Sequence, residues 1–197
     1  MKKIIGLLAL SSMMFLALPV SAQEIVGQDT GDIPINGTLG LDNTDETAPI
    51  VEGNDAWINV TLPTDTIFYS TNTELNAPIT SPDYTITNNS GRPVKVMYNK
   101  LVKSGGDADV VDYDVSLKGF ATANPAIITA GAVTDNSGAP ILLDTLANTN
   151  GKLLEADTAD THSNEVTYGY TGTVNEALGA TVNHNFDMTL EFESVAW

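Results

Sequence analysis

The sequence predicts an all-β domain, an antiparallel β-sandwich of short strands with long acidic loops. Apolar and polar residues alternate with period two along several short segments, which is the pattern of half-buried strands. Clusters of Gly, Pro, Asn and Asp separate these segments at short intervals, as in sandwiches and barrels. No stretch of the sequence carries a long apolar stripe with helical spacing. We therefore expect roughly nine to eleven strands in sheets with one solvated face.

The first 22 residues are typical of an export signal. Lys2 and Lys3 form a positive start, residues 4–18 are mostly apolar, and residues 20–22 are small enough for a signal peptidase site. The alternative is a membrane anchor, but a spanning helix needs about 20 apolar residues and this run is shorter. We expect cleavage after residue 22, no transmembrane segment in the product, and a secreted, extracellular location.

The rest of the chain is predicted to form two parts. Residues 23–54 are rich in Gly, Asp and Thr and form an acidic lead segment. Within it, residues 33–39 alternate as one short strand, which Pro34 restricts to a sheet edge. Residues 42–46 have the composition of a loop. Residues 55–197 are predicted to be the β-sandwich domain.

Strands of the first half of this domain share an alternating pattern and end at turn residues. They are predicted at residues 57–62, 66–69, 84–88 and 93–98. Pro63 ends the first of them, and residues 89–93 form a turn cluster before the last. Residues 104–107 are predicted to be another turn, because Gly105 and Gly106 stand between Ser and Asp. Short turns of this kind usually join antiparallel strands.

The second half contains the clearest strand of the sequence. Residues 113–118 alternate, whereas residues 120–138 show a weaker pattern, and the apolar runs at residues 141–146 and 152–154 fit either a strand or one helical turn. At residues 186–193 one face is wholly apolar and the other polar or acidic. A helix would spread these apolar residues around its axis, so this segment is predicted to be an amphipathic strand.

Composition excludes some classes of partner. The chain has 25 Asp and Glu against eight Lys and Arg, a formal net charge of −17. Such a surface repels phosphates and anionic lipid heads, so we expect no binding to nucleic acid. The chain has no cysteine. Its stability therefore depends on the core rather than on disulfides. Among exported proteins, the absence of cysteine favours one from a Gram-positive bacterium.

No catalytic constellation is visible in the sequence. The two histidines, His162 and His184, lack thiol partners for a zinc site, and there is no Gly-x-Ser-x-Gly motif. A glycosidase needs only two carboxylates, but such sites usually also have aromatic sugar platforms, and the chain has two Trp. We predict a protein that is not an enzyme, with no catalytic residues and no cofactor. A carbohydrate-active enzyme is the less favoured alternative.

Calcium is the ion that the sequence best suits. Four closely spaced carboxylates offer hard oxygen ligands: Asp107, Asp109, Asp112 and Asp114. Their spacing does not match the loop of an EF-hand. The favoured interpretation is a solvated acidic loop, and these residues are only weak candidates for a metal site.

Two further features suggest binding. Lys95, Lys100 and Lys103 lie in or just beyond one predicted strand, and the favoured interpretation is an edge strand protected from aggregation by charge. The alternatives are a basic stripe for an anionic wall polymer, or a Lys–Asn isopeptide crosslink. Trp57 is expected in the core; if it is exposed, it marks a binding patch.

Two segments resemble a known family of surface proteins. Residues 57–64 and 81–96 resemble the pattern of Gram-positive cell-surface proteins from WxL-type gene clusters. The defining Trp-x-Leu is not present, because Ile58 and Asn59 follow Trp57. The resemblance implies a secreted β-rich protein held non-covalently at the cell surface, or working beside such proteins. It implies no catalysis.

These observations predict a secreted, non-enzymatic cell-surface protein, a wall-associated module for adhesion, binding or interaction. The expected partners are a cell-wall polymer or other surface proteins. The alternative is a structural subunit of a surface fibre or pilus. That alternative follows from the last strand, which is long, amphipathic and terminal, so that it suits strand exchange with a neighbour.

Overall fold

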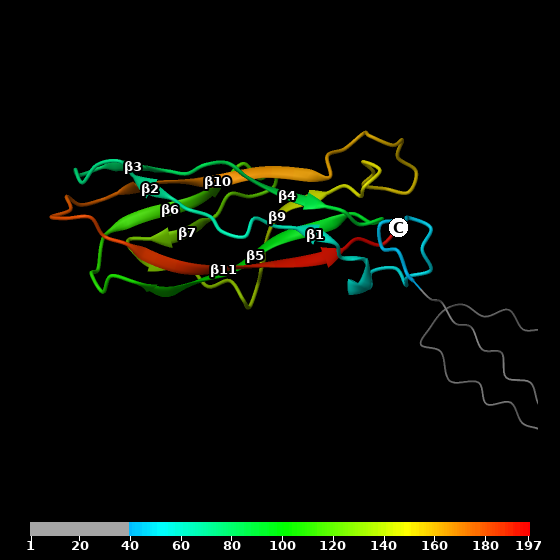
Figure 1. Ribbon diagram of the computed structural model, residues 1–197, viewed down its shortest axis with the longest axis horizontal. Helices are drawn as coiled ribbons and strands as arrows, with labels where there is room; N and C mark the ends of the chain where they lie inside the picture. Colours follow the sequence, from blue (N-terminus) through cyan, green and yellow to red (C-terminus); the bar gives the residue numbers. More distant parts are fainter. Residues whose placement is uncertain (1–39) are drawn as a thin grey trace, which may run out of the picture. The chain divides into compact units, whose positions relative to one another are not determined.

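The computed structural model describes residues 40–197 as an all-β domain of antiparallel sheets (Figure 1), which confirms the predicted fold class. The predicted export signal and the predicted strand at residues 33–39 lie outside the described residues. One 3₁₀ helix, η1, covers Asp55–Trp57. The strands are β1 (Val60–Thr61), β2 (Tyr69–Ser70), β3 (Ala77–Thr80), β4 (Tyr84–Asn88), β5 (Val94–Gly106), β6 (Tyr113–Lys118), β7 (Ala126–Thr129), β8 (Ala132–Val133), β9 (Ile141–Leu146), β10 (Glu165–Val174) and β11 (His184–Ser194). No helix in this part of the chain has the length and apolar character needed to cross a membrane.

The larger sheet is built around β10. Its order is β1-β4-β10-β6-β7-β8, and β3 pairs with the second half of β10 while β2 pairs with β3. Thus β10 has β6 on one side and, in succession, β4 and β3 on the other. The strand is central because Val166, Tyr168 and Tyr170 alternate with small residues, so that its apolar side chains face the core.

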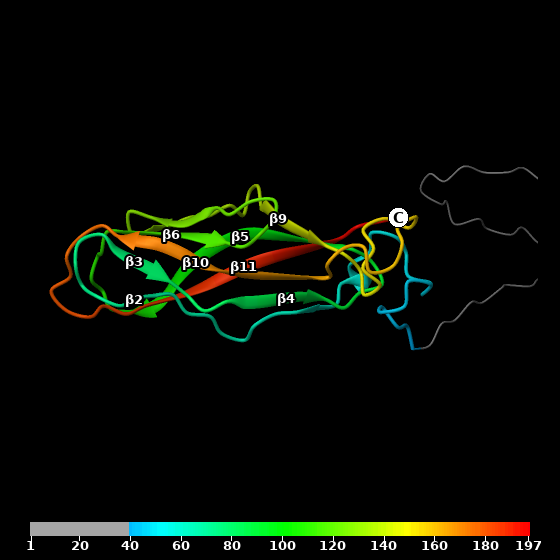
Figure 2. The ribbon, with the colours of Figure 1, turned by 90° about the horizontal axis from the view of Figure 1, so that it is seen from above.

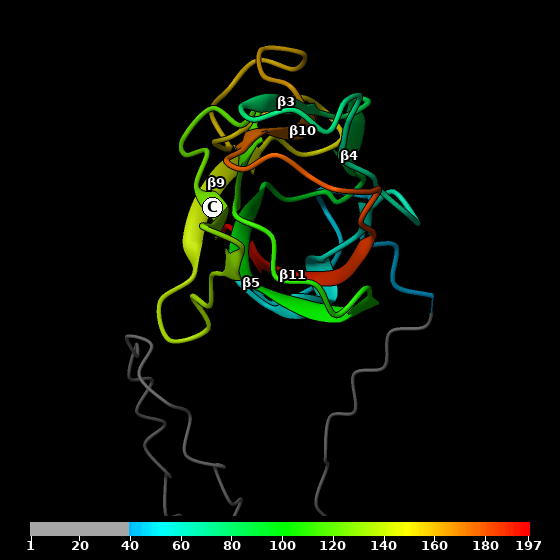
Figure 3. The ribbon, with the colours of Figure 1, turned by 90° about the vertical axis from the view of Figure 1, so that its left-hand side faces the viewer.

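The smaller sheet has the order β11-β5-β9. β5 and β11 pair along the whole length of β11, with two irregularities in register. β9 pairs only with the first part of β5, from Val94 to Tyr98. Figures 1 and 2 show that the strands of both sheets run in roughly the same direction, and the view along them in Figure 3 shows the two sheets on opposite sides of the core.

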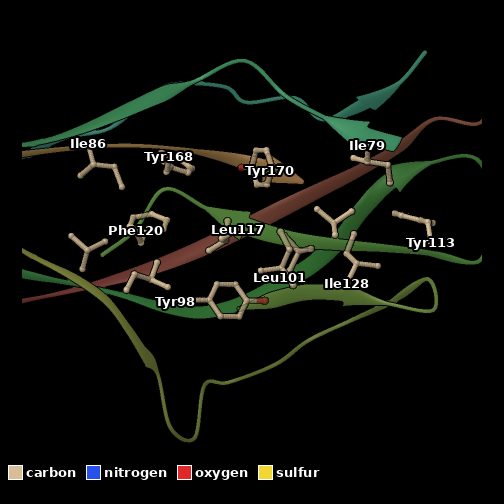
Figure 4. Packing of buried hydrophobic residues seen from close by; sticks show 14 of the residues in the cluster. Ile79, Ile86, Tyr98, Leu101, Tyr113, Leu117, Phe120, Ile128, Tyr168 and Tyr170 are labelled. Carbon is tan, nitrogen blue, oxygen red and sulfur yellow. The ribbon is translucent and has the colours of Figure 1, made fainter. Parts of the chain in front are cut away.

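The core lies between the two sheets. Figure 4 shows Tyr168 and Tyr170 of β10 on one side and Tyr98 and Leu101 of β5 on the other, with Leu117 of β6 between them. Each of these side chains is at most 5 % exposed. Burial of such large side chains stabilises the fold by about 1.5–3 kcal/mol each. Because the chain has no disulfides, its stability depends on this burial.

Strand β5 continues through residues predicted to form a turn. The predicted turn at residues 104–107 starts too early, because β5 extends to Gly106 and Gly105 still pairs with Asn185 of β11. Gly106 has φ of 91°, and a Cβ there would lie 2.2 Å from the carbonyl oxygen of Asn183. A glycine is therefore required where the two longest strands of the smaller sheet meet their connecting loops.

Residues 40–54, which the sequence prediction assigns to the lead segment, include a loop that packs against the sandwich. The N–H of Gly91 donates to the carbonyl of Asn43 over 2.7 Å. A Cβ on Gly91 would lie 2.8 Å from the backbone of Asp45, so the loop packs directly on the β4–β5 turn.

Several predicted segments differ in detail. β10 and β3 are absent from the predicted strands, and the ambiguous run at residues 141–146 is a strand, β9. Residues 152–154 form bends rather than a strand or a helical turn. Of the predicted strand at residues 66–69, only Tyr69 is in a strand. The remaining residues pass the edge of β11 without pairing, and they form part of the site described next.

Candidate functional site

An open groove of about 770 Å³ runs along β11. One wall is residues 184–190 of β11, and the other is residues 62–68, the segment between β1 and β2. The floor lies between the walls and consists of Leu101, Ile127, Tyr168 and Tyr170. We call this feature the flank groove. It gives a path from the solvent to the side chains of the core.

The β11 wall presents an apolar face that the domain covers only in part. Phe186, Met188, Leu190 and Phe192 are all partly buried, and the residues between them are exposed. In the neighbouring strand β5, Val94, Val96 and Tyr98 are 0 % exposed. The two strands belong to one sheet and face the same core, so the difference shows that the domain covers β11 less completely than β5.

The backbone of β11 is also unpaired on one side. β11 pairs with β5 and, among residues 40–197, with no other strand. In an antiparallel strand, alternate residues direct their N–H and C=O groups to opposite edges. Half of these groups on β11 therefore lie along the flank groove without a strand partner, which is the arrangement that accepts an added strand.

The opposite wall is fixed although it is not a strand. The N–H of Ile67 donates to the hydroxyl of Tyr84 over 2.7 Å, and Thr66 Oγ1 lies 2.8 Å from the hydroxyl of Tyr170. Leu62 and Ile67 on this wall are 42 % and 54 % exposed. Exposed large apolar side chains on one wall, facing a partly buried apolar strand on the other, are typical of interaction sites.

The floor of the flank groove is uncharged. Burial raises the pKa of both Tyr168 and Tyr170, and the nearby tyrosines raise that of Tyr168 further. The two hydroxyls therefore stay protonated at neutral pH and act as hydrogen-bond donors or acceptors. Asp65 and Asp187 are the only carboxylates lining the groove among the described residues. A neutral aromatic floor suits apolar side chains.

His184 closes one end of the groove and connects it to a second pocket of about 360 Å³. Its Nε2 lies 3.1 Å from the carbonyl oxygen of Asp109, and its Nδ1 lies 2.9 Å from the hydroxyl of Tyr113. A carbonyl only accepts, so Nε2 donates to Asp109, and Nδ1 faces the hydroxyl of Tyr113. Burial raises the pKa of Tyr113 to about 12, so its hydroxyl stays protonated. Both ring nitrogens of His184 are thus occupied.

The structure separates the three lysines. β5 lies between β11 and β9, so the prediction that its first part is an edge strand is wrong. Lys95 pairs with Glu193 of β11 over 2.6 Å on the outer face. Lys103 is opposite Phe186 in the register, on the other face, and its Nζ donates to the carbonyl of Asp107 over 2.8 Å. Lys100 is opposite Thr189. The three side chains do not share one face as a basic stripe.

The four acidic candidates for calcium act as acceptors in the loops. Asp107 accepts from the N–H of Asn183, and both Asp112 and Asp114 accept from the side-chain amide of Asn175. The hydrogen bond from the side chain of Asn175 and one from the backbone N–H of Ala130 lower the pKa of Asp114. Asp109 uses its backbone carbonyl toward His184. Within residues 40–197, no three acidic or His side chains converge as a metal site would require.

Trp57 is part of a buried cluster that the sequence reasoning did not identify. It is 0 % exposed, so it presents no binding patch. The guanidinium of Arg92 lies 4.3 Å from the Trp57 ring and 4.5 Å from the ring of Trp197. The only arginine and both tryptophans of the chain thus meet. We call this group, with Glu52, the arginine clasp.

Polar contacts complete the arginine clasp. Arg92 Nε lies 3.0 Å from Glu52 Oε2, and its Nη1 donates to the carbonyls of Glu46 and Gly91. The hydrogen bond from Arg92 lowers the pKa of Glu52. The N–H of Trp197 donates to the same carboxylate. The clasp ties the loop before η1, the β4–β5 turn and the C-terminus together, and its role is structural.

Only one wall of the flank groove is recognisable in the sequence. The terminal amphipathic strand was recognisable from its alternation, but the opposite wall and the tyrosine floor come from segments whose proximity only the fold creates. No protein-family model matches the chain, and no curated protein matches it. The resemblance to WxL-type surface proteins therefore stays a prediction from residues 57–64 and 81–96.

Proposed function

We propose that this protein is a secreted, non-enzymatic interaction module of the cell surface, and that it binds an extended polypeptide segment in the flank groove. The observation that carries the proposal is the unpaired edge of β11 beside an apolar face that is only partly covered. A bound segment would add a strand to the smaller sheet. Its backbone would bond β11, and its alternate side chains would enter the groove.

The groove chemistry favours a polypeptide over a wall polymer. Anionic polymers would meet the carboxylates of Asp187, Glu191 and Glu193 on the exposed face of β11, and the lysines that would attract them lie on different faces. Neutral sugars would find the aromatic floor at the bottom of the groove rather than on a platform. A strand meets all three parts of the site at once, the unpaired edge, the apolar wall and the neutral floor.

The cellular setting is proposed from the sequence. The export signal at residues 1–22 and the resemblance to WxL-type proteins support a location at the surface of a Gram-positive bacterium. Such a location supplies other surface proteins as partners. The acidic surface keeps the module soluble and selects against nucleic acid.

Retention on isolated cell walls tests this function. We expect the secreted chain to stay on the walls in high salt, because apolar and backbone contacts are screened little by ions. Met188→Asp should abolish retention, since its carboxylate would enter the groove. Thr189→Asp is the matched control, because residue 189 is on the exposed face, and it should be retained like the natural chain.

Hydrogen exchange gives the second readout of the same experiment. Binding of a strand should slow exchange of alternate amides in residues 184–190, whereas binding elsewhere leaves them unchanged. Loss of retention in high salt without any protection of β11 would replace the proposal with electrostatic binding of a wall polymer.

A further inference from the structure

We propose that the segment bound in the flank groove is residues 33–39 of a second copy of this chain. The inference rests on the proposed function and names the partner for the same site. The occupant must be extended, must present apolar side chains on one face, and must tolerate the acidic exposed face of β11. The sequence of residues 33–39 suits each of these requirements.

The segment has the alternation that the groove needs. Ile33, Ile35 and Leu39 fall on one face, with Gly37 in the same series, and Pro34, Asn36 and Thr38 fall on the other. The segment contains seven residues, and each wall of the groove is also seven residues long. A strand laid between the walls would therefore match them in length and direct its isoleucines and leucine to the floor.

The proline fits the asymmetry of the two walls. In a strand, the N–H groups of residues 33, 35, 37 and 39 point to one edge and those of residues 34, 36 and 38 to the other. If the first set bonds β11, Pro34 lies toward residues 62–68, which form no strand and present no ladder to bond. The missing donor of Pro34 then costs nothing.

Charge also agrees. Residues 33–39 carry no charge, although the chain as a whole is strongly acidic. The exposed face of β11 carries Asp187, Glu191 and Glu193, so an acidic strand beside it would be repelled. Asn36 and Thr38 would face outward next to these carboxylates without repulsion.

The position of Gly40 favours a second copy over the same chain. The loop that follows Gly40 packs beside the C-terminus, at the end of the domain where β11 finishes (Figure 1), and the N–H of Val195 bonds Pro93 there. A strand running directly out of Gly40 would pass this end first. Its residues 33–39 would lie beside the last part of β11, and the acidic, glycine-containing residues 25–32 would have to fill the groove.

A second copy has no such restriction and can place residues 33–39 between the walls. Each copy would then offer one segment and one groove, which is a head-to-tail contact that builds an open chain of subunits. This arrangement gives a physical basis to the alternative of a surface fibre.

Complementation of two variants tests the inference. Ile35→Asn places an amide on the apolar face of the segment, and Met188→Asp disrupts the groove. In sedimentation velocity the natural secreted chain should form a ladder of oligomers as concentration rises. Each variant alone should associate about tenfold more weakly or not at all, and a mixture of the two should give a 1:1 complex, because one intact segment and one intact groove remain.

Matched controls and a peptide keep the test decisive. Thr38→Asn makes the same change on the outward face and should assemble like the natural chain. A synthetic peptide of residues 31–39 should slow amide exchange along residues 184–190 of the Ile35→Asn chain, and a scrambled peptide should not. This readout does not depend on the folding of Met188→Asp.

Three results would overturn the inference. If the natural chain stays monomeric, the peptide does not bind, and Ile35→Asn has no effect while Met188→Asp still loses wall retention, the groove serves another protein and only the inference fails. If the natural chain is monomeric and Ile35→Asn exposes β11 to exchange, the segment folds back on its own chain. If the Met188→Asp chain still assembles and is still retained on cell walls, both the inference and the proposed function fail.

Discussion

β11 ends in one kind of environment and begins in another. At its C-terminal end the arginine clasp surrounds Arg92 with two tryptophan rings, a carboxylate and two backbone carbonyls. Along the flank groove the same strand has an unpaired edge, and Phe186, Met188 and Leu190 are only partly covered. The first region is closed by its own chain, whereas the second is open.

The contrast separates stability from binding within one strand. Regions that pack closely against the rest of the domain contribute most to the free energy of unfolding, and regions left partly uncovered can gain contacts from a partner. We expect substitutions at the clasp to change the free energy of unfolding, and substitutions in the groove to change association more than folding.

Arg92→Met should give the largest loss of stability. It leaves Glu52 without its cation and the carbonyls of Glu46 and Gly91 without their donor. Arg92 is buried but the side chain of Glu52 is 39 % exposed, so the loss comes mainly from the carbonyls left without a donor, at about 1–3 kcal/mol each. Urea unfolding measures the loss, and Lys95→Met is the matched control, because its pair with Glu193 is exposed and should cost about 1 kcal/mol or less. Equal losses from the two variants would mean that the clasp is not a centre of stability.

A pair of identical truncations compares the core with the groove. Leu143 in β9 is 0 % exposed, and Leu190 in β11 is partly exposed on the groove wall. Leu143→Ala should lower the free energy of unfolding by about 3 kcal/mol because it leaves a cavity. Leu190→Ala should lower the free energy of unfolding by about 1 kcal/mol, since the side chain of Leu190 already contacts solvent when the chain is monomeric. A larger loss from Leu190→Ala, measured by urea unfolding, would show that the groove is closed in solution.

The smallest expected effect is a pH dependence located at the clasp. The pKa of Glu52 is lowered in the folded chain, so its contribution is complete above the ordinary pKa of a glutamate and is lost as pH falls through the lowered value. Acidification should therefore destabilise the natural chain more than Glu52→Gln, by about 1 kcal/mol or less at this partly exposed side chain. Urea unfolding at neutral pH and at about pH 3 gives the comparison. An unchanged difference between the two proteins would remove Glu52 from the acid response.

Alternation predicted the fold class, because it depends only on neighbouring residues along one strand. Thus β11 and β6 were visible from their sequence, and Pro63 ends the first predicted strand close to where β1 ends. β10 also alternates, at Val166, Tyr168 and Tyr170, but its glycines and threonines weaken the strand pattern, and its central place in the sheet depends on pairing with β6, β4 and β3. A Cβ on Gly172 would lie 1.9 Å from the carbonyl of Asp114, so the glycine reflects a contact that only the fold makes.

The site was predictable only in part, for a similar reason. The amphipathic pattern of residues 186–193 indicated a strand suited to exchange, but not that its second edge is open. Residues 66–69, which include the end of the second wall, are predicted to be a strand because Ile67, Phe68 and Tyr69 favour strands. In the fold, the backbone N–H of Ile67 donates to the hydroxyl of Tyr84, and the Thr66 hydroxyl bonds that of Tyr170, so this segment is held by side chains rather than by strand pairing. Arg92 joins residues more than 100 positions apart along the chain, which no local pattern reports.

Amide exchange along the smaller sheet tests most directly whether the flank groove accepts a strand. The measurement compares the natural secreted chain at high concentration with the Ile35→Asn chain under the same conditions. We predict that the amides of residues 184–190 that point away from β5 exchange slowly only in the natural chain. The amides of Val94–Tyr98 in β5 stay protected in both proteins because β11 and β9 flank this strand. Fast exchange of the same β11 amides in both proteins, at a concentration where the natural chain is associated, would contradict this account.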